Sequence, residues 1–284
     1  MIKSKLKIFL TFFSLILLTA CSQPEKKSLD IVFQYKTDID YWKMYDFSNT
    51  LIPTKEIYEE TIREQIAAIE KEYNLTDWWS YVNPEAETLY LNLQIYDTDT
   101  FSMSHPYKVT SKDIEATLTI PTIAMEDGNP IANRLAHELT HLIFGCYNVS
   151  IEEGFANYTS ALLYSDDISY HDAQIAKKQH INLMIEEANL SADEIAYVTD
   201  VVGDGTITYG YFPNMTLLAL FNYQYSQSFV TYLIDTYGTE KFVEFAISAK
   251  SNDDYETYFG KNLDTLRNEW LTYFEQIEVP DVNS

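Results

Sequence analysis

The hydrophobic pattern of this chain changes its period near residue 145, and that change limits the folds open to it. Before this point, alternating apolar residues predict strands at Leu29–Tyr35, Thr88–Asp97 and Ala116–Ile123. Helical spacing predicts helices at Thr54–Tyr73 and Pro130–Phe144 among them. After this point, helical spacing dominates and predicts helices at Ile151–Tyr164, Asp172–Ala188, Asn214–Tyr237, Thr239–Lys250, Asp253–Phe259 and Leu263–Ile277. The pattern therefore predicts an α+β fold, with a small mixed sheet in an upper lobe and a helical lower lobe.

The composition is that of a folded and strongly acidic protein. The chain has 284 residues, of which 46% are hydrophobic, and a formal net charge of −24. That length is enough for a sizeable core, and no Pro/Ser-rich linker separates the two halves, so we expect one domain. The excess of acidic groups argues against binding to nucleic acid, because the chain has no excess of cations to replace the counterions of phosphates.

The first residues have the order of a bacterial lipoprotein signal. Three lysines among the first seven residues precede the apolar run Ile8–Leu18, which is too short to anchor the chain across a bilayer. The sequence Leu-Thr-Ala-Cys ends at Cys21 and resembles a lipobox, whose cysteine accepts a lipid before cleavage. The alternative is an ordinary signal peptide with an accidental cysteine. We predict a signal peptide at residues 1–20 and lipidation of Cys21.

Lipidation would place the protein on the extracytoplasmic face of the cell membrane. A polar tether is expected at residues 21–30, followed by one domain at 31–284. Its upper lobe would span about residues 31–145 and its helical lower lobe about 146–278. The second cysteine, Cys146, would then have no disulfide partner and is expected to be a small buried hydrophobe.

The helix predicted just before residue 145 carries the pattern His-Glu-x-x-His and has clear end signals, with Asn129 as N-cap and Gly145 beyond its last turn. Residues four apart on a helix lie one above the other, so His137 and His141 can point at one ion. Glu138 lies about 100° around the helix from His137, where it can contact a water on that ion without being a ligand. Zinc hydrolases use this arrangement. The alternative is a pair of solvent-facing histidines beside a surface glutamate.

A catalytic zinc usually has three protein ligands, and Glu153 is the candidate for the third. It follows His141 in the first turn of the next predicted helix, which must fold back against the motif helix. Glu152 is the competing candidate, but the glycine at 154 permits a close helix approach and favours Glu153. Ser150 and Glu153 also match a capping box, in which Glu153 would bond the Ser150 amide instead.

Together, His-Glu-Leu-Thr-His and the Glu-Gly-Phe-Ala-Asn-Tyr at 153–158 resemble the gluzincin metallopeptidases, and more narrowly the peptidase MA-like family of exported bacterial proteins. The resemblance extends over about residues 118–274. One position departs from the family, which often has tryptophan where this chain has Ser150. Later matches to the family are Tyr223–Leu233 with Tyr237-Gly238, and Phe259-Gly260 with Leu263 and Trp270.

The resemblance implies a zincin-like fold, with the active-site helix in the upper lobe, and a zinc peptidase activity. Glu138 would be the general base and then the proton donor to the leaving amine. Tyr223 aligns with a tyrosine that supports the oxyanion, and Tyr225, two residues away, is the alternative. The Zn²⁺ ligands would be His137, His141 and Glu153.

The expected partner is a peptide or protein substrate. By analogy of fold, it would lie extended along an edge strand, for which Ala116–Ile123 is the candidate. The rival interpretation is a non-catalytic surface lipoprotein that binds a metal or a substrate with a zincin-like fold. The intact Glu138 favours the enzyme, because a pure binding protein has no need of that carboxylate.

Overall fold

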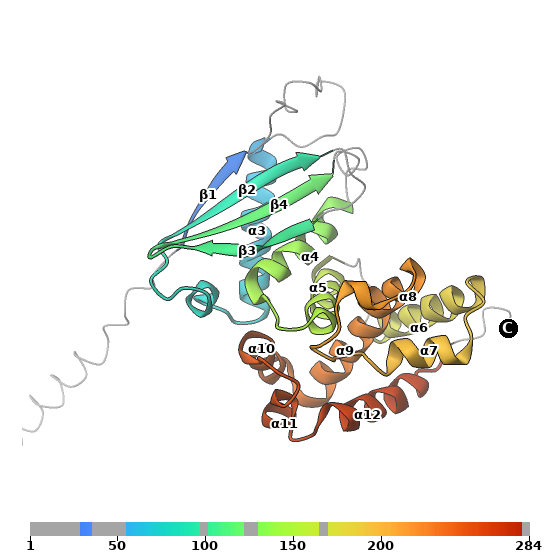
Figure 1. Cartoon of the computed structure of the whole chain (residues 1–284). Coiled ribbons are helices and arrows are strands. Elements are labelled where there is room, and N and C mark those ends of the chain that lie inside the picture. Colours follow the sequence, from blue (N-terminus) through green and yellow to red (C-terminus); the bar gives the residue numbers. More distant parts are fainter. Residues whose placement is uncertain (1–28, 36–54, 97–101, 122–129, 165–169, 280–284) are drawn as a thin grey trace, which may run out of the picture.

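The computed structural model describes residues 29–35, 55–96, 102–121, 130–164 and 170–279. Over these ranges the protein has the mixed α+β architecture that the sequence predicts, with one small sheet and a largely helical remainder (Figure 1). None of the helices within these ranges combines the length and the apolar character needed to cross a membrane. The predicted signal peptide, Cys21 and most of the predicted tether lie outside the described residues.

The sheet is mixed and has the strand order β1-β2-β4-β3. Three parallel strands, β1 (Asp30–Tyr35), β2 (Thr88–Tyr96) and β4 (Asp113–Pro121), are joined by β3 (Ser102–Val109), which runs antiparallel to β4. Alternate residues of the two central strands point to one face of the sheet and make it apolar. The buried residues of this face are Leu89, Leu91, Leu93, Ile114, Ala116 and Leu118.

The edge strand of the sheet is not the one that the sequence predicts. The prediction of an edge at Ala116–Ile123 is wrong, because β4 lies between β2 and β3. The edge beside β4 is β3, which the hydrophobic pattern did not indicate. Its sequence alternates poorly, contains Pro106 and shifts its register between Ser104 and Lys108. Proline has no amide hydrogen to donate, so a strand of this kind is tolerated at an edge, where part of the ladder is unused.

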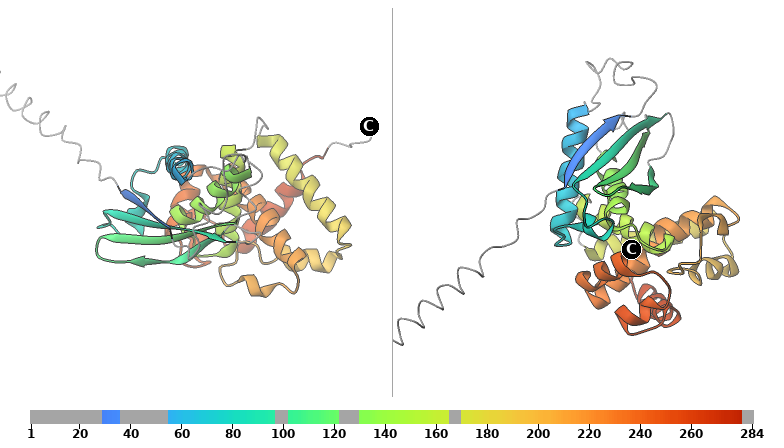
Figure 2. Two further views of the ribbon diagram at one scale, coloured as in Figure 1. Left: turned by 90° about the horizontal axis from the view of Figure 1, so that it is seen from above. Right: turned by 60° about the vertical axis from the view of Figure 1, so that its left-hand side comes forward.

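Two helices, α3 (Lys55–Glu72) and α4 (Pro130–Phe144), lie on one side of the sheet (Figure 2). Each was predicted from its apolar spacing, and each buries that stripe. The buried residues are Ile62, Ile66 and Ile69 of α3 and Leu135, Leu139 and Leu142 of α4. The sheet and α3 therefore form the support on which α4 is held.

A tight turn follows α4. Gly145 has a φ of 47°, and its amide donates to the carbonyl of His141 at 3.1 Å. This left-handed ending confirms the predicted glycine cap. The next residue, Cys146, is a free cysteine that packs partly buried against the core, so it is less buried than predicted. Desolvation raises the pKa of its thiol well above its usual range.

The rest of the described chain is mainly helical. Five of the six helices predicted after residue 145 are found, with ends within about two residues of the prediction. The helix α7 (Ala192–Thr199) was not predicted, although Ser191 and Glu194 form a capping box at its start. The other helices are α5 (Val149–Tyr164), α6 (Tyr170–Glu187), α10 (Thr239–Ser248), α11 (Asp254–Phe259) and α12 (Leu263–Glu275).

The sixth predicted helix, Asn214–Tyr237, is divided into three parts. A π-helix at Leu220–Tyr225 separates α8 (Met215–Ala219) from α9 (Ser226–Tyr237). A π turn contains an extra residue, so it changes the direction of the side chains relative to a continuous α-helix. Within it Tyr223 is 45% exposed, whereas two residues later Tyr225 is only 3% exposed.

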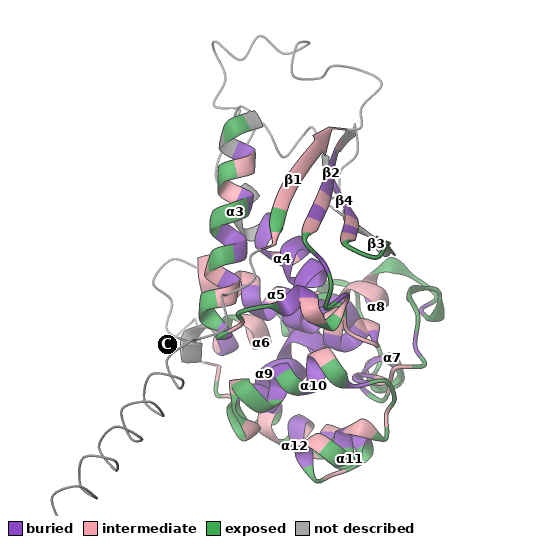
Figure 3. Cartoon of the chain, turned by 90° about the vertical axis from the view of Figure 1, so that its left-hand side faces the viewer, coloured by how far each residue is buried: buried purple, intermediate pink, exposed green. Residues whose placement is uncertain are grey.

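The helix α5 lies at the centre of the helical part and is largely buried from Ser150 to Thr159 (Figure 3). On one side its Phe155 meets Phe144 of α4, with ring centroids 4.5 Å apart. On the other side Gly154 lies against α9. A Cβ at this position would be 2.4 Å from the carbonyl oxygen of Ser226 and 2.9 Å from Val230. Only glycine allows this approach. The sequence led us to expect a close helix contact at this residue, but the helix that it contacts is α9 and not the motif helix α4.

We expect the substitution Gly154→Ala to lower the free energy of unfolding by about 1–3 kcal/mol, because the added methyl group must push α9 away. This loss would exceed the gain in helix propensity, which is about 1 kcal/mol. Gly210→Ala is the matched control, since a Cβ there meets nothing within 4 Å. Urea unfolding of both variants measures the difference. Equal stability of the two would show that the helices adjust at no cost.

Candidate metal centre

The two motif histidines converge at one point, as their spacing predicts. His137 and His141 lie on successive turns of α4, and their Nε2 atoms are 3.1 Å apart. Their ring centroids are 4.7 Å apart and the ring planes are nearly perpendicular. His141 is buried, and the side chain of His137 is 15% exposed. The two histidines are thus largely shielded from solvent and are not a pair of solvent-facing surface residues.

Glu153 brings a carboxylate to the same point from α5. Its Oε2 atom lies 3.4 Å from Nε2 of His137 and 3.9 Å from Nε2 of His141. That oxygen is buried and has no hydrogen-bond partner among the described residues. One nitrogen from each histidine and one carboxylate oxygen all lie within 4.8 Å of one another.

These separations fit a metal ion. Ligand atoms about 2.1 Å from a tetrahedral ion lie roughly 3.4 Å from one another. The three measured separations, 3.1, 3.4 and 3.9 Å, bracket that value. His137, His141 and Glu153 could therefore hold a metal ion.

The capping box that competed with ligation by Glu153 is not how α5 begins. Asn148 caps the helix instead, with its Oδ1 accepting from the amide of Ile151 at 2.7 Å. Ser150 is buried, and its hydroxyl pairs with that of Ser226 at 2.8 Å. The Glu153 carboxylate is consequently directed at the histidines.

Glu152, the competing ligand candidate, lies behind the histidines. Its Oε1 atom is 3.3 Å from Nδ1 of His141, the ring nitrogen that faces away from the other histidine. A carboxylate on the second nitrogen of a metal-binding histidine orients the ring and raises its basicity. Glu152 is thus placed to support the ligand His141.

The site carries an excess of negative charge. Burial lowers the pKa of His141, yet the neighbouring carboxylates outweigh burial and raise it to about 9. Burial alone would raise the pKa of Glu153, but the two imidazoles lower that pKa below its usual value. The carboxylates that act on His141 are Glu152, Glu153 and Glu138. A cation between these groups would offset their charge.

The two tyrosines considered for a functional role have different surroundings. The ring of Tyr223 lies 6.5 Å from that of His137, and burial together with the charges of Glu153 and Glu138 raises the pKa of its phenol. It therefore stays protonated and can donate a hydrogen bond. Tyr225 packs in the core against Trp270 and Phe274. The π-helix thus places Tyr223 beside the histidines and Tyr225 away from them.

Two side chains bind the carbonyl groups of the π-helix and hold Tyr223 in place. Asn157 of α5 donates to the carbonyl of Glu153 at 2.8 Å and to that of Asn222 at 3.4 Å. Lys177 of α6 donates to the carbonyl of Tyr223 at 3.2 Å, and burial lowers the pKa of its amine to about 8. The π-helix is thereby fixed from two neighbouring helices.

Tyr209 belongs to the site and was not predicted from the sequence. Its hydroxyl donates to Oε1 of Glu153 at 2.6 Å. It lies in a short 3₁₀ turn at Tyr209–Tyr211, outside all the helices and strands that the sequence predicts. With 23 tyrosines in the chain, nothing in the pattern distinguishes this one.

Comparison with known proteins assigns no family to the chain. No family model matches it, and no curated protein is significantly similar to it in sequence. The resemblance to gluzincins therefore rests on the motifs quoted above, and its place is in the proposal that follows.

We expect the purified protein to bind one divalent metal ion per chain. Loss of a residue that only supports a ligand typically weakens metal binding about 10–100-fold. Glu153→Ala removes a ligand itself, so it should weaken binding by more than that. Elemental mass spectrometry gives the stoichiometry and chelator competition gives the affinity. Glu244→Ala, an exposed glutamate on α10, is the control and should bind normally. Unchanged affinity in Glu153→Ala would contradict this assignment of the ligands.

Proposed function

We propose that this protein is a zinc metallopeptidase of the gluzincin type, held by a lipid on the extracytoplasmic face of the cell membrane. The observation that carries the proposal is the convergence of His137, His141 and Glu153 from two helices. Two imidazoles and one carboxylate are the ligand set of several zinc peptidases, and three protein ligands leave a position open for chemistry. Zinc bound there would supply Lewis-acid activation of water and of the scissile carbonyl.

Glu138 is the proposed proton carrier. It follows His137 on α4, is 7% exposed, and its charge acts on both His141 and Tyr223. A carboxylate in that position accepts a proton from the attacking water and then delivers it to the leaving amine. It does not belong to the group of three side chains that could hold the metal.

Tyr223 is the proposed donor to the oxyanion. Its phenol is half-exposed beside His137 and remains protonated. A neutral hydroxyl donor stabilises the negative charge that develops on the carbonyl oxygen during attack. The exposure of Tyr223 leaves it open to a substrate.

The proposed substrate is a peptide in extended conformation. β3 is the edge strand that contacts α4, and no described strand pairs with its outer edge. Free backbone groups on such an edge can pair with an added strand. A peptide bound there would run along the helix that carries the histidines, and this supports a zincin-like arrangement of substrate and metal.

We expect Glu138→Gln to reduce peptide cleavage by about 10²–10⁴-fold with zinc content unchanged, because the proton carrier is lost and the ligands remain. Mass spectrometry of a peptide library after digestion measures it. Tyr223→Phe should reduce cleavage by about 10²-fold, and Tyr225→Phe should have no effect.

Equal cleavage by wild type and Glu138→Gln would sink the proposed mechanism. If the zinc-loaded wild type cleaves no member of the library, the rival interpretation, a binding lipoprotein that retains a metal site, would take its place.

The location follows from the lipobox-like sequence at Cys21. β1 begins at Asp30, so a lipid on Cys21 would keep the domain within about 30 Å of the bilayer, the reach of a fully extended tether. The substrates would then be peptides or proteins at the cell surface.

Cys21→Ala should release the protein from the membrane fraction of an expressing bacterium, since the acceptor thiol is absent. Labelling with a palmitate analogue, followed by fractionation, tests this. Cys146→Ala serves as control and should stay labelled. Labelling that persists in Cys21→Ala would show that the lipid is attached elsewhere, and a wild type that takes up no label would show that the signal is of the ordinary kind.

A further inference from the structure

Tyr209 holds one oxygen of the Glu153 carboxylate and leaves the other free for an ion. Its hydroxyl donates to Oε1 at 2.6 Å. The other oxygen, Oε2, faces Nε2 of His137 at 3.4 Å. A carboxylate held in this way presents a single oxygen to the metal position.

The hydroxyl of Tyr209 is a stable donor. A phenol loses its proton only well above neutral pH. The group therefore remains protonated beside an ionised carboxylate. Hydrogen bonds between a neutral donor and a carboxylate are short and about twice as strong as those between neutral groups.

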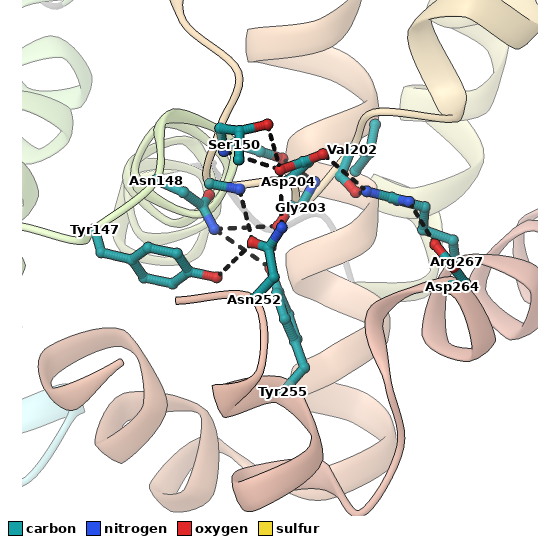
Figure 4. Close-up of polar contacts among 12 residues, drawn as sticks. Tyr147, Asn148, Ser150, Val202, Gly203, Asp204, Asn252, Tyr255, Asp264 and Arg267 are labelled. Carbon is teal, nitrogen blue, oxygen red and sulfur yellow. Dashed lines mark hydrogen bonds and ion pairs between the residues drawn. The ribbon is translucent and has the colours of Figure 1, made fainter. Parts of the chain in front are cut away.

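The loop that carries Tyr209 is anchored at Gly203 (Figure 4). The Gly203 amide donates to the hydroxyl of Ser150 at 2.9 Å. Its carbonyl accepts from the side-chain amide of Asn148 at 3.2 Å and from the hydroxyl of Tyr255 at 2.7 Å. Gly203 has a φ of 80°, and a Cβ there would lie within 2.9 Å of three side chains, so no other residue fits.

The residues on both sides of Gly203 are also held by side chains of other segments (Figure 4). The side chain of Asn252 accepts from the amide of Gly205 at 2.9 Å and donates to Oδ1 of Asp204 at 2.8 Å. Arg267 donates from Nε to the carbonyl of Val202 at 2.6 Å. The loop is thus bound to three separate parts of the helical region.

The loop and the ligand share one helical turn. Asn148 and Ser150, which bind the loop, open the helix α5 that carries Glu153. Any movement of that turn would therefore shift Glu153 and the base of the loop together. This common attachment couples the base of the loop that carries Tyr209 to the helix that carries Glu153.

We propose that Tyr209 is a positioning residue that orients Glu153 for binding through one oxygen, and that the anchored loop from Val202 to Tyr209 belongs to the metal centre. The inference rests on the metal centre of the proposed function but does not depend on peptide hydrolysis. Tyr209 acts through Glu153 and takes no part in the reaction itself.

The test compares Tyr209→Phe with Tyr211→Phe, a control in the same turn whose ring stacks on Tyr197 at 5.1 Å between centroids. Zinc affinity is measured in the absence of peptide by competition with a chromophoric chelator. Tyr209→Phe should raise the dissociation constant of zinc about 10–100-fold, the range typical of losing a group that orients a ligand. Tyr211→Phe should bind as the wild type does.

A second readout separates positioning from general loosening. The second readout is the visible absorption of the cobalt-loaded protein. In Tyr209→Phe, release of Oε1 would let Glu153 bind cobalt through both oxygens, which raises the coordination number from four to five. Five-coordinate cobalt absorbs more weakly than four-coordinate cobalt, so the absorption band should weaken in this variant alone. Equal zinc affinities and equal cobalt spectra in the two variants and the wild type would overturn the proposal, as would a wild type that binds no metal. Lack of peptide cleavage, with the difference in zinc affinity intact, would overturn only the proposed hydrolysis.

Discussion

The close contact between α5 and α9 at Gly154 is the packing on which the candidate site depends. The helices approach so closely that a methyl group on residue 154 would overlap the carbonyl of Ser226. Glu153 directly precedes this contact on one helix, and the π-helix with Tyr223 directly precedes it on the other. One glycine thus brings the third ligand and the exposed tyrosine to the histidines. A larger residue would separate groups that lie far apart in the sequence.

The first turn of α5 combines several tasks in few residues. Asn148 caps the helix and binds the loop, Ser150 binds both the loop and α9, and Glu153 faces the histidines. The hydroxyl of Ser150 is buried and is satisfied by Gly203 and Ser226. Because a buried polar group needs partners, Ser150 ties the loop of Tyr209 to the site.

The electrostatics of the site favour a cation. Three carboxylates act on the buried His141 and raise its pKa despite desolvation. The net charge of −24 adds a field of the same sign over the whole protein. Tyr209 and Tyr223 contribute neutral donors without adding charge, because the same carboxylates keep their phenols protonated. The negative charge thus stays concentrated on the groups that face the histidines.

The sequence by itself determined the α+β class, most helices and the positions of His137 and His141, because helical periodicity and a fixed spacing of four residues are local properties. It also pointed to Glu153, because two histidines leave a zinc site short of a third ligand and Glu153 opens the next helix, although Glu152 and a capping box were open alternatives. Only the tertiary structure decided what depends on contacts between distant segments: the edge position of β3, the exposure of Tyr223 by the π-helix, and the hydrogen bond from Tyr209 to Glu153. That bond joins residues 56 positions apart, and packing rather than any local pattern sets their distance.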